Sequence, residues 1–277
     1  MFSRREFCVV GASSILLPTA CRAAPARGAA YASILERGFA PETVEWADRT
    51  WRCNMGSTWN AGMDYCLQLG AKTARFEIRN TERDHSKIDP PGKLRSELSG
   101  SLPGGNRERL PNGVPLWGAM TFIHHRWADP LGMARLHGGV HGQIHIGSKF
   151  GGSPAVAFRR TNDGQLLITT RGELDADGNG SVRFRGPVSF DEAHDLVYNL
   201  VLDPNAGSLR VWIDGRKIVD ISGVSIGSHF AQSYWNIGCY YGSGASCPVV
   251  AEYANHVYPA PGDLTARTRR PAAWPVS

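Results

Sequence analysis

A short run of residues, Gln143-Ile144-His145, places an amide and an imidazole two positions apart. The segment 142–149 alternates polar and apolar residues and predicts a β-strand, on which side chains two apart share a face. Gln143 and His145 would then point one way, while Ile144 and Ile146 point into a core. An amide beside an imidazole can bind an anionic group and move a proton. A solvent-exposed polar pair on an amphipathic strand would give the same pattern. The case for an active site therefore depends on whether other strands place matching side chains on the same face.

Two further segments carry chemically useful side chains in the same alternation. Arg95 and Glu97 share one face of the segment 93–98, whose other face is apolar. In the segment 234–240, Tyr234, Asn236 and Tyr240 share one face and alternate with apolar residues. If these strands and the Gln143 strand lie in one sheet, a guanidinium, an amide, an imidazole and a phenol meet on one surface. Alternatively, Arg95 and Glu97 form an ordinary cross-strand ion pair, and Tyr234 and Tyr240 are cross-strand aromatic residues with solvated hydroxyls.

Three further cations could bind an acidic ligand. Arg75 and Arg79 flank Glu77 on the polar face of the segment 74–79, and Lys149 ends the histidine strand. Gly238 lies between the two tyrosines of segment 234–240, where a missing side chain would let a ligand approach the backbone.

Many short alternating segments, separated by glycine-rich turns such as 162–164 and 177–180, predict an all-β sandwich or jelly roll. Helical periodicity is limited to the neighbourhoods of 56–69 and 130–136, and the tail after Pro259 is expected to be loose surface chain. The expected strands are 74–79, 93–98, 116–124, 143–149, 155–160, 165–170, 181–188, 196–202, 208–214, 217–221, 234–241 and 252–258.

Three motifs, in this order, resemble the signatures of polysaccharide lyase family 7, the alginate lyases: Arg-Ser-Glu-Leu at 95–98, Gln-Ile-His at 143–145, and Tyr-Trp-Asn-Ile-Gly-Cys-Tyr at 234–240. Two positions depart from the family pattern. Asn236 stands where a lysine is usual, and no Asn or Gln follows Tyr240 as it does in alginate lyases. Both departures bear on the substrate more than on the reaction.

The chain is also similar to jelly-roll lyases that act on glucuronan and heparin, in the segment 209–215 and in Ser153-Pro154. The resemblance covers residues 74–258. It implies an all-β, concanavalin A-like β-jelly roll, which is a two-sheet antiparallel sandwich with a concave groove. It also implies an enzyme that needs no cofactor and works as a monomer.

The implied reaction is β-elimination on a 4-O-linked uronate of an acidic polysaccharide, with an alginate-like polyuronate favoured over glucuronan or a glycosaminoglycan. Arg95, Gln143 and His145 would stabilise the charge that develops on the substrate carboxylate. Tyr240 would exchange protons with C5 and O4, and His145 is a second candidate base for the opposite C5 epimer. Glu97 would hold Arg95 in position. The substrate-binding candidates are Arg75, Arg79, Lys149, Tyr234 and Asn236.

Other functions fit the residues less well. A non-catalytic glycan-binding module would need aromatic platforms but no base. A sandwich-fold glycoside hydrolase would need paired carboxylates, but Gly178 stands where Glu173-Leu174-Asp175 would require a second glutamate. Segment 175–180 matches half of a calcium loop, yet Gly186 occupies the twelfth position, so a hairpin turn is favoured over calcium. The histidines between 124 and 145 have no zinc spacing, and we expect no metal.

The N-terminal residues predict an export signal. Arg4 and Arg5 form a twin-arginine pattern before a short apolar run and an alanine-rich stretch, so residues 1–29 are expected to be removed. Residues 30–277 would then form one lyase domain, periplasmic or secreted. Thr19-Ala20-Cys21 allows the alternative of a lipoprotein anchored at Cys21. The apolar run is too short to span a membrane.

Removal of the signal changes the charge and leaves four cysteines. The chain carries a net charge of +5, and the +3 of residues 1–29 leaves only +2, with no lysine-rich run to suggest nucleic acid. An even number of cysteines in an oxidising compartment predicts two disulfides. Proximity in sequence favours Cys53–Cys66 and Cys239–Cys247, against the alternative of buried thiols.

Overall fold

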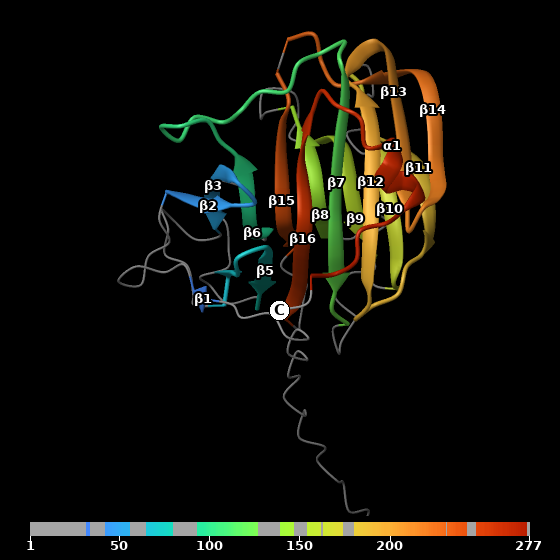
Figure 1. The fold of residues 1–277 in the computed structure, drawn as a ribbon. Helices are drawn as coiled ribbons and strands as arrows, with labels where there is room; N and C mark the ends of the chain where they lie inside the picture. Colours follow the sequence, from blue (N-terminus) through green and yellow to red (C-terminus); the bar gives the residue numbers. More distant parts are fainter. Residues whose placement is uncertain are drawn as a thin grey trace, which may run out of the picture.

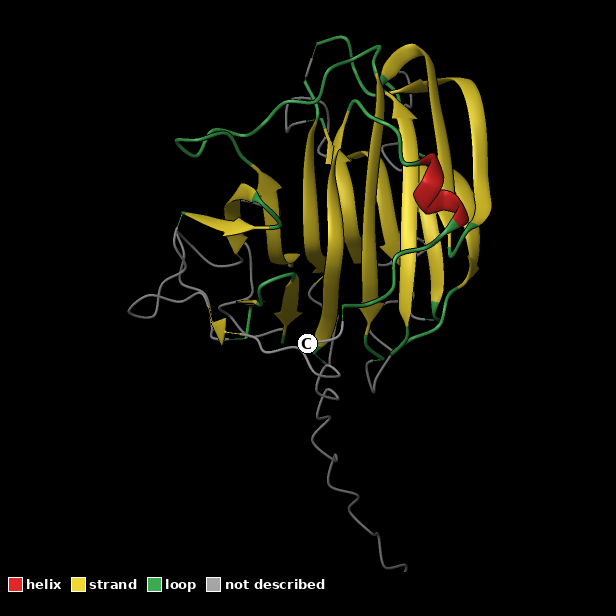
Figure 2. Ribbon diagram, viewed as in Figure 1, coloured by secondary structure: helices red, strands yellow, loops and turns green. Residues whose placement is uncertain are grey.

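The computed structural model describes residues 32–33, 42–55, 65–79, 93–126, 139–146, 154–161, 163–173, 180–230, 232–242 and 248–275. Within these ranges the chain forms two eight-stranded antiparallel sheets that pack as a sandwich, with one short helix (Figures 1 and 2). No helix among these residues is long and apolar enough to cross a membrane. The predicted all-β jelly roll is confirmed.

Each sheet combines strands from distant parts of the chain. In spatial order, the first sheet contains β1 (Ala32–Ser33), β4 (Leu67–Leu69), β5 (Thr73–Ile78), β16 (Val249–Ala260), β7 (Pro115–His124), β12 (Ala193–Val201), β13 (Asp203–Ile213) and β14 (Arg216–Ile226). The second sheet contains β11 (Ser181–Pro187), β10 (Gln165–Thr170), β9 (Pro154–Arg160), β8 (Gly139–His145), β15 (Tyr234–Gly242), β6 (Lys93–Gly100), β3 (Arg49–Met55) and β2 (Thr43–Trp46).

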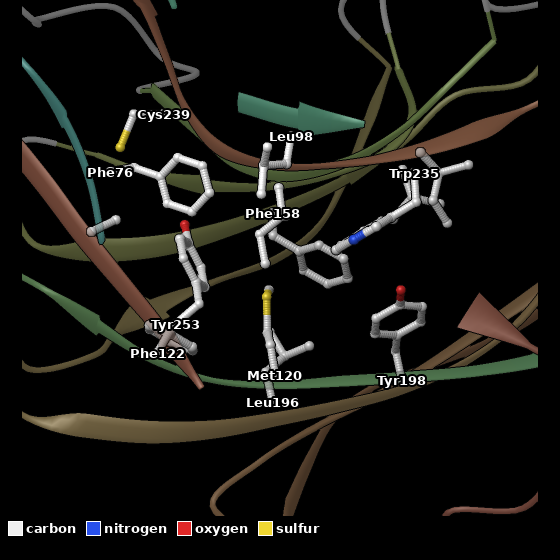
Figure 3. Packing of buried hydrophobic residues seen from close by; sticks show 14 of the residues in the cluster. Phe76, Leu98, Met120, Phe122, Phe158, Leu196, Tyr198, Trp235, Cys239 and Tyr253 are labelled. Carbon is white, nitrogen blue, oxygen red and sulfur yellow. The ribbon is translucent and has the colours of Figure 1, made fainter. Parts of the chain in front are cut away.

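The apolar residues of the alternating strands meet between the two sheets (Figure 3). Phe158 and Trp235 of the second sheet face Tyr198 and Met120 of the first, and all four are buried. The ring centroid of Tyr198 lies 5.3 Å from that of Phe158 and 5.7 Å from that of Trp235. Burial of such large rings dominates the energetics of a core. Because one side of each strand is committed to this core, its other side is fixed on the outer face of the sheet.

Gly238 has a structural role that differs from the predicted one. Its φ of +139° is unfavourable for other residues, and a Cβ there would lie 2.3 Å from the Ser96 carbonyl oxygen and 2.7 Å from the Glu97 Cα. The glycine therefore allows β15 and β6 to approach each other, and the neighbouring strand fills the space that the sequence suggested for a ligand.

Every expected strand has an observed counterpart, with some ends shifted, whereas β1 to β4 were not expected. Residues 67–69, which the sequence placed in a possible helix at 56–69, form strand β4. Residues 56–64 of that segment and the other possible helix, 130–136, lie outside the described residues.

The prediction of a loose tail after Pro259 is wrong. Helix α1 (Thr265–Arg269) packs against the first sheet because Arg267 binds the buried carboxylate of Asp195, with Nε 3.1 Å from Oδ2.

The predicted Cys53–Cys66 disulfide is wrong. Cys53 is a free, buried thiol on β3 of the second sheet, and Cys66 lies next to β4 of the first. Burial among apolar side chains raises the pKa of Cys53 to about 12, so the thiol is unreactive. Cys239 is also a free thiol and points into the core (Figure 3). Its predicted partner, Cys247, lies outside the described residues.

Candidate active site

The three motif-bearing strands are neighbours in the second sheet, in the order β8-β15-β6. Their register places Tyr240 opposite Arg95, Asn236 opposite Gln143, and Tyr234 opposite His145. The alternate residues of these strands are in the core, so the chemically useful side chains share the outer face. We call this surface, around Arg95, Glu97, Gln143, His145, Tyr234 and Tyr240, the site face.

Glu97 is the buried centre of the site face. Its carboxylate lies 3.2 Å from Nη1 of Arg95 and accepts a hydrogen bond of 2.7 Å from Nε2 of Gln143. The Glu97 side chain is 1 % exposed and that of Arg95 is 11 % exposed. A buried carboxylate that joins both donors fixes their orientation. The supporting role expected for Glu97 stays a prediction, which these two contacts motivate.

Tyr240 lies among cations and remains partly exposed. The guanidinium carbon of Arg95 lies 4.6 Å from the centroid of the Tyr240 ring, and Nζ of Lys93 lies 5.8 Å from it. On the other side, Arg159 of β9 and Tyr240 both pair with Val140 of β8, so they lie in one row across the sheet. Positive charge on both sides stabilises a phenolate, the form in which tyrosine accepts a proton.

Arg159 itself is a residue that sequence reasoning missed. Its Nε is shielded from solvent and has no hydrogen-bond partner. Burial lowers the pKa of Arg159 to about 10, and the nearby Tyr240 hydroxyl partly offsets this shift. The alternation of segment 155–160 could have placed Arg159 on the outer face, but not beside Tyr240, because that neighbour comes from a distant part of the chain.

His145 and Tyr234 form a second pair on the site face. The Tyr234 hydroxyl lies 3.2 Å from Nδ1 of His145. The guanidinium carbons of Arg107 and Arg109 lie 4.6 Å and 5.5 Å from the centroid of the Tyr234 ring. Burial raises the pKa of Tyr234, and these arginines and Arg95 partly offset the rise. Arg107 and Arg109 lie in a connection without alternation, so no sequence pattern pointed to them.

Asn236 is less accessible than a substrate-binding role requires. It is 1 % exposed, and its Oδ1 accepts a hydrogen bond of 2.5 Å from the Ser99 hydroxyl. Ser99 in turn accepts a hydrogen bond from the amide of Asn54 on β3. The three side chains link β3, β6 and β15 beneath the exposed part of the site face.

The other predicted cations do not join the site face. Arg75 and Arg79 lie on or next to β5 of the first sheet, and both are ion-paired with Glu77. Phe76 between them faces the core, so the arginines lie on the opposite side of that strand. Lys149 lies outside the described residues, as does most of the segment 175–180 with its partial calcium pattern.

The histidine-rich stretch is divided by a register shift. The shift between Val140 and Gly142 turns His141 into the interior, although simple alternation would place it beside Gln143. His141 bonds the Tyr241 hydroxyl, and its ring centroid lies 3.8 Å from that of His124. Burial lowers the pKa of His141 to about 3. The described residues contain no group of ligands that could hold a metal ion.

No protein-family model and no curated protein sequence matches the chain. Its fold is similar to two solved structures. One is an alginate lyase from Pseudomonas aeruginosa, with 19% sequence identity, 72% of this chain and 86% of that chain covered, and a TM-score of 0.51. The other is an endo-β-1,4-glucuronan lyase from the fungus Trichoderma reesei, with 13% identity, 83% and 94% covered, and a TM-score of 0.50. At these identities the comparison establishes a shared fold, the jelly-roll sandwich on which both of those lyases are built.

Proposed function

We propose that the protein is a polysaccharide lyase that cleaves a 4-O-linked uronate polysaccharide by β-elimination. The observation that carries the proposal is the site face, where Arg95, Gln143, His145 and Tyr240 project from three adjacent strands. These are the donors and the proton-transfer group that the reaction needs. The two solved lyases with this fold support the same reaction class.

The chemistry begins at the substrate carboxylate. The C5 proton is weakly acidic because removing it adds negative charge beside an existing carboxylate. The guanidinium of Arg95 and the N–H groups of Gln143 and His145 stabilise that charge as it develops. The electrons of the C5–H bond form the C4–C5 double bond, and the bond from C4 to O4 breaks. Tyr240 takes the proton from C5 and gives a proton to O4, which leaves with the electron pair of the C4–O4 bond.

The substrate that we favour is an alginate-like polyuronate, with glucuronan or a glycosaminoglycan as the alternative. The arginines around the two tyrosines support an anionic substrate: Arg107 and Arg109 lie over Tyr234, and Arg159 lies near Tyr240. Arg107 and Arg159 each have an Nε that is shielded from solvent and has no hydrogen-bond partner. A polyanion would compensate this positive charge.

The test is direct. The purified protein is incubated with alginate, glucuronan, heparin and hyaluronan, and the ultraviolet absorbance of an unsaturated uronate is followed. We expect one of these polymers to give the absorbance. In Tyr240→Phe, which loses only an oxygen, binding should survive while turnover falls by at least ~10²-fold. Binding without turnover in the wild-type protein would instead indicate a glycan-binding module. Wild-type turnover in folded Tyr240→Phe would exclude Tyr240 from proton transfer.

We also propose that the twin arginines direct export to the periplasm or beyond, in the folded state, with anchoring at Cys21 as the alternative. Arg4 and Arg5 before a short apolar run support this. Replacing both with lysine should leave the protein in the cytoplasm, as cell fractionation would show. Unchanged export would contradict the proposal.

A further inference from the structure

Three arginines lie at the Tyr234 end of the site face, beside the groups that the proposed reaction uses. Arg107 and Arg109 come from the connection between β6 and β7, and their guanidinium carbons lie 4.6 Å and 5.5 Å from the centroid of the Tyr234 ring. Arg52 lies on β3 opposite Ser99, between two core residues, so it points to the same outer face. We call Arg52, Arg107 and Arg109 the arginine cluster.

Backbone groups hold this cluster in place. Arg52 and Arg109 each donate a hydrogen bond to a backbone carbonyl oxygen, that of Gly105 at 3.5 Å and that of Gln232 at 3.1 Å. These bonds link the connection between β6 and β7 to strand β3 and to the connection between β14 and β15. The two connections run side by side (Figure 1). Side chains that are fixed in this way lose little conformational freedom when they bind a ligand.

No ion pair joins an acidic side chain to the arginine cluster in the described part of the chain. Glu108, in the same connection, is paired with Arg49, and Glu97 is paired with Arg95. The Nε of Arg107 is shielded from solvent and has no hydrogen-bond partner. A shielded cation without a partner is unfavourable in the free protein, and an anionic ligand would satisfy it.

Arg107 also lies within the electric field of three other arginines. Burial lowers the pKa of Arg107, and the nearby Tyr234 hydroxyl partly offsets the shift. The positive charges of Arg52, Arg95 and Arg109 lower it further. An anion bound among these four guanidinium groups would offset their mutual repulsion, so the arrangement favours an anionic ligand.

One substrate carboxylate does not balance this charge. In the proposed reaction the carboxylate of the reacting uronate is bound by Arg95, Gln143 and His145, and Arg95 is already paired with Glu97. Glu97 and that carboxylate together balance two of the four arginine charges. The remaining positive charge lies beside Tyr234, where a second anionic group would be stabilised.

We propose that the arginine cluster is a second anion subsite, which binds the carboxylate or sulfate of another sugar of the same polymer while the reacting uronate occupies the centre of the site face. Tyr234 joins the two, because Arg107 lies over its ring and its hydroxyl lies 3.2 Å from Nδ1 of His145. The identity of the reacting sugar rests on the proposed function. Binding of an anionic oligosaccharide at Arg107 does not depend on cleavage.

Oligosaccharides of defined length test the subsite. The Tyr240→Phe protein, which is expected to bind without turnover, is titrated with unsulfated oligouronates and with heparin oligosaccharides of increasing length. We expect the affinity to rise by at least ~10-fold at the length that first reaches Arg107, the scale of a charge-assisted hydrogen bond. Adding Arg107→Met should remove this step.

The two series distinguish the source of the anion. A step with the unsulfated oligouronates would identify a carboxylate, and a step with heparin oligosaccharides alone would identify a sulfate. No step in either series would overturn the proposal, and so would a step that persists with Arg107→Met. An equal loss of affinity at every length would also overturn it, because Arg107 would then act on the reacting sugar itself.

The matched control is Arg126→Met. Arg126 is exposed next to the end of β7 in the first sheet, and its guanidinium carbon lies 5.3 Å from the centroid of the Phe190 ring. This variant removes the same charge from an aromatic ring away from the site face, so the length step should remain. A step lost equally in Arg126→Met would show that overall charge, and not the arginine cluster, is responsible.

Two more variants keep the test decisive. Arg107→Lys keeps the charge but loses the planar fork of donors, so it should restore part of the step. If Arg107→Met fails to fold, Arg109→Met replaces an exposed member of the same cluster and should reduce the step. An unchanged step in folded Arg109→Met would then count against the subsite.

Binding and cleavage separate this inference from the proposed function. If the wild-type protein cleaves none of the polymers while the length step requires Arg107, the lyase function fails and the subsite stands. If a polymer is cleaved and the step does not require Arg107, the subsite fails and the lyase function stands.

Discussion

At the scale of single residues, the site face holds more positive charge than the protein itself compensates. Arg95 has Glu97 as a partner, 3.2 Å away. The side chains of Arg107 and Arg159 have no ion pair or hydrogen bond among the described residues, and their Nε atoms are shielded from solvent. Retaining such groups costs stability. A site that binds a polyanion accounts for them, since the substrate would supply the missing negative charge.

The variant Arg159→Met tests, at one position, whether uncompensated positive charge costs stability and serves substrate binding. Because the methionine removes a poorly compensated charge, we expect the free energy of unfolding to stay the same or to rise by about 1 kcal/mol. Cleavage of the polyuronate should weaken, with kcat/KM lower by about tenfold, which corresponds to ~1.4 kcal/mol. Urea denaturation and the absorbance assay measure the two effects.

The control for this experiment is Arg210→Met. Arg210 is exposed and ion-paired with Asp220 on the first sheet, so its loss should change stability by no more than about 0.5 kcal/mol and leave activity intact. A loss of stability in Arg159→Met without a loss of activity would show that Arg159 has only a structural role.

At the scale of elements, the C-terminal helix depends on one ion pair more than on helix propensity. Helix α1 has five residues, no side-chain cap and no acidic residue in its first turn. Arg267 nonetheless bonds both oxygens of Asp195, a residue that is 3 % exposed, and donates to the Asn255 carbonyl oxygen at 2.7 Å. Such a short helix forms because tertiary contacts hold it in place.

Two neighbouring arginines of this helix should therefore behave differently on mutation. Arg267→Ala leaves the Asp195 carboxylate buried without its partner, and we expect a loss of about 3–5 kcal/mol in unfolding free energy. Arg269 is exposed, so Arg269→Ala should change stability by no more than about 0.5 kcal/mol. Chemical denaturation of both variants makes the comparison, and equal effects would exclude the ion pair as the cause.

At the scale of the whole molecule, the sandwich lowers the pKa values of three of the described histidines. Burial lowers the pKa values of His141 and His256 to about 3, and that of His124 well below its usual value. Each group binds a proton more readily in the unfolded chain, whose histidines titrate near pH 6.5. Their contribution to stability is therefore complete above about pH 6.5 and is lost as the pH falls toward 3.

The expected result is a free energy of unfolding that falls by up to about 1.4 kcal/mol per pH unit for each of these histidines. The slope is measured between pH 6.5 and 5, where most carboxylates remain ionised. His256→Gln removes one titrating group and keeps an acceptor for the indole N–H of Trp235, now 3.0 Å from Nε2 of His256. This variant should have a shallower slope. An identical slope would show that His256 does not titrate on unfolding.

The sequence alone determined the features that depend on local period. Alternation fixed which residues of the segments 93–98 and 234–240 face the core, because a strand buried on one side cannot shift by one residue without exposing its apolar side chains. Each strand expected from such alternation is present. The motif residues Arg95, Gln143, His145 and Tyr240 accordingly share one face, and the resemblance identified the fold correctly.

Only the tertiary structure decided which strands are neighbours, because hydrogen bonding between strands joins residues far apart in the chain. Arg75 and Arg95 have the same local pattern, yet they lie in different sheets. Cys53 and Cys66 are close in sequence but belong to opposite sides of the sandwich, so the expected disulfide is not formed. A register shift turned His141 inward, and pairing across β8 brought Arg159 into the row of Tyr240. Pattern within a strand sets the direction of a side chain, and pairing between strands sets its neighbours.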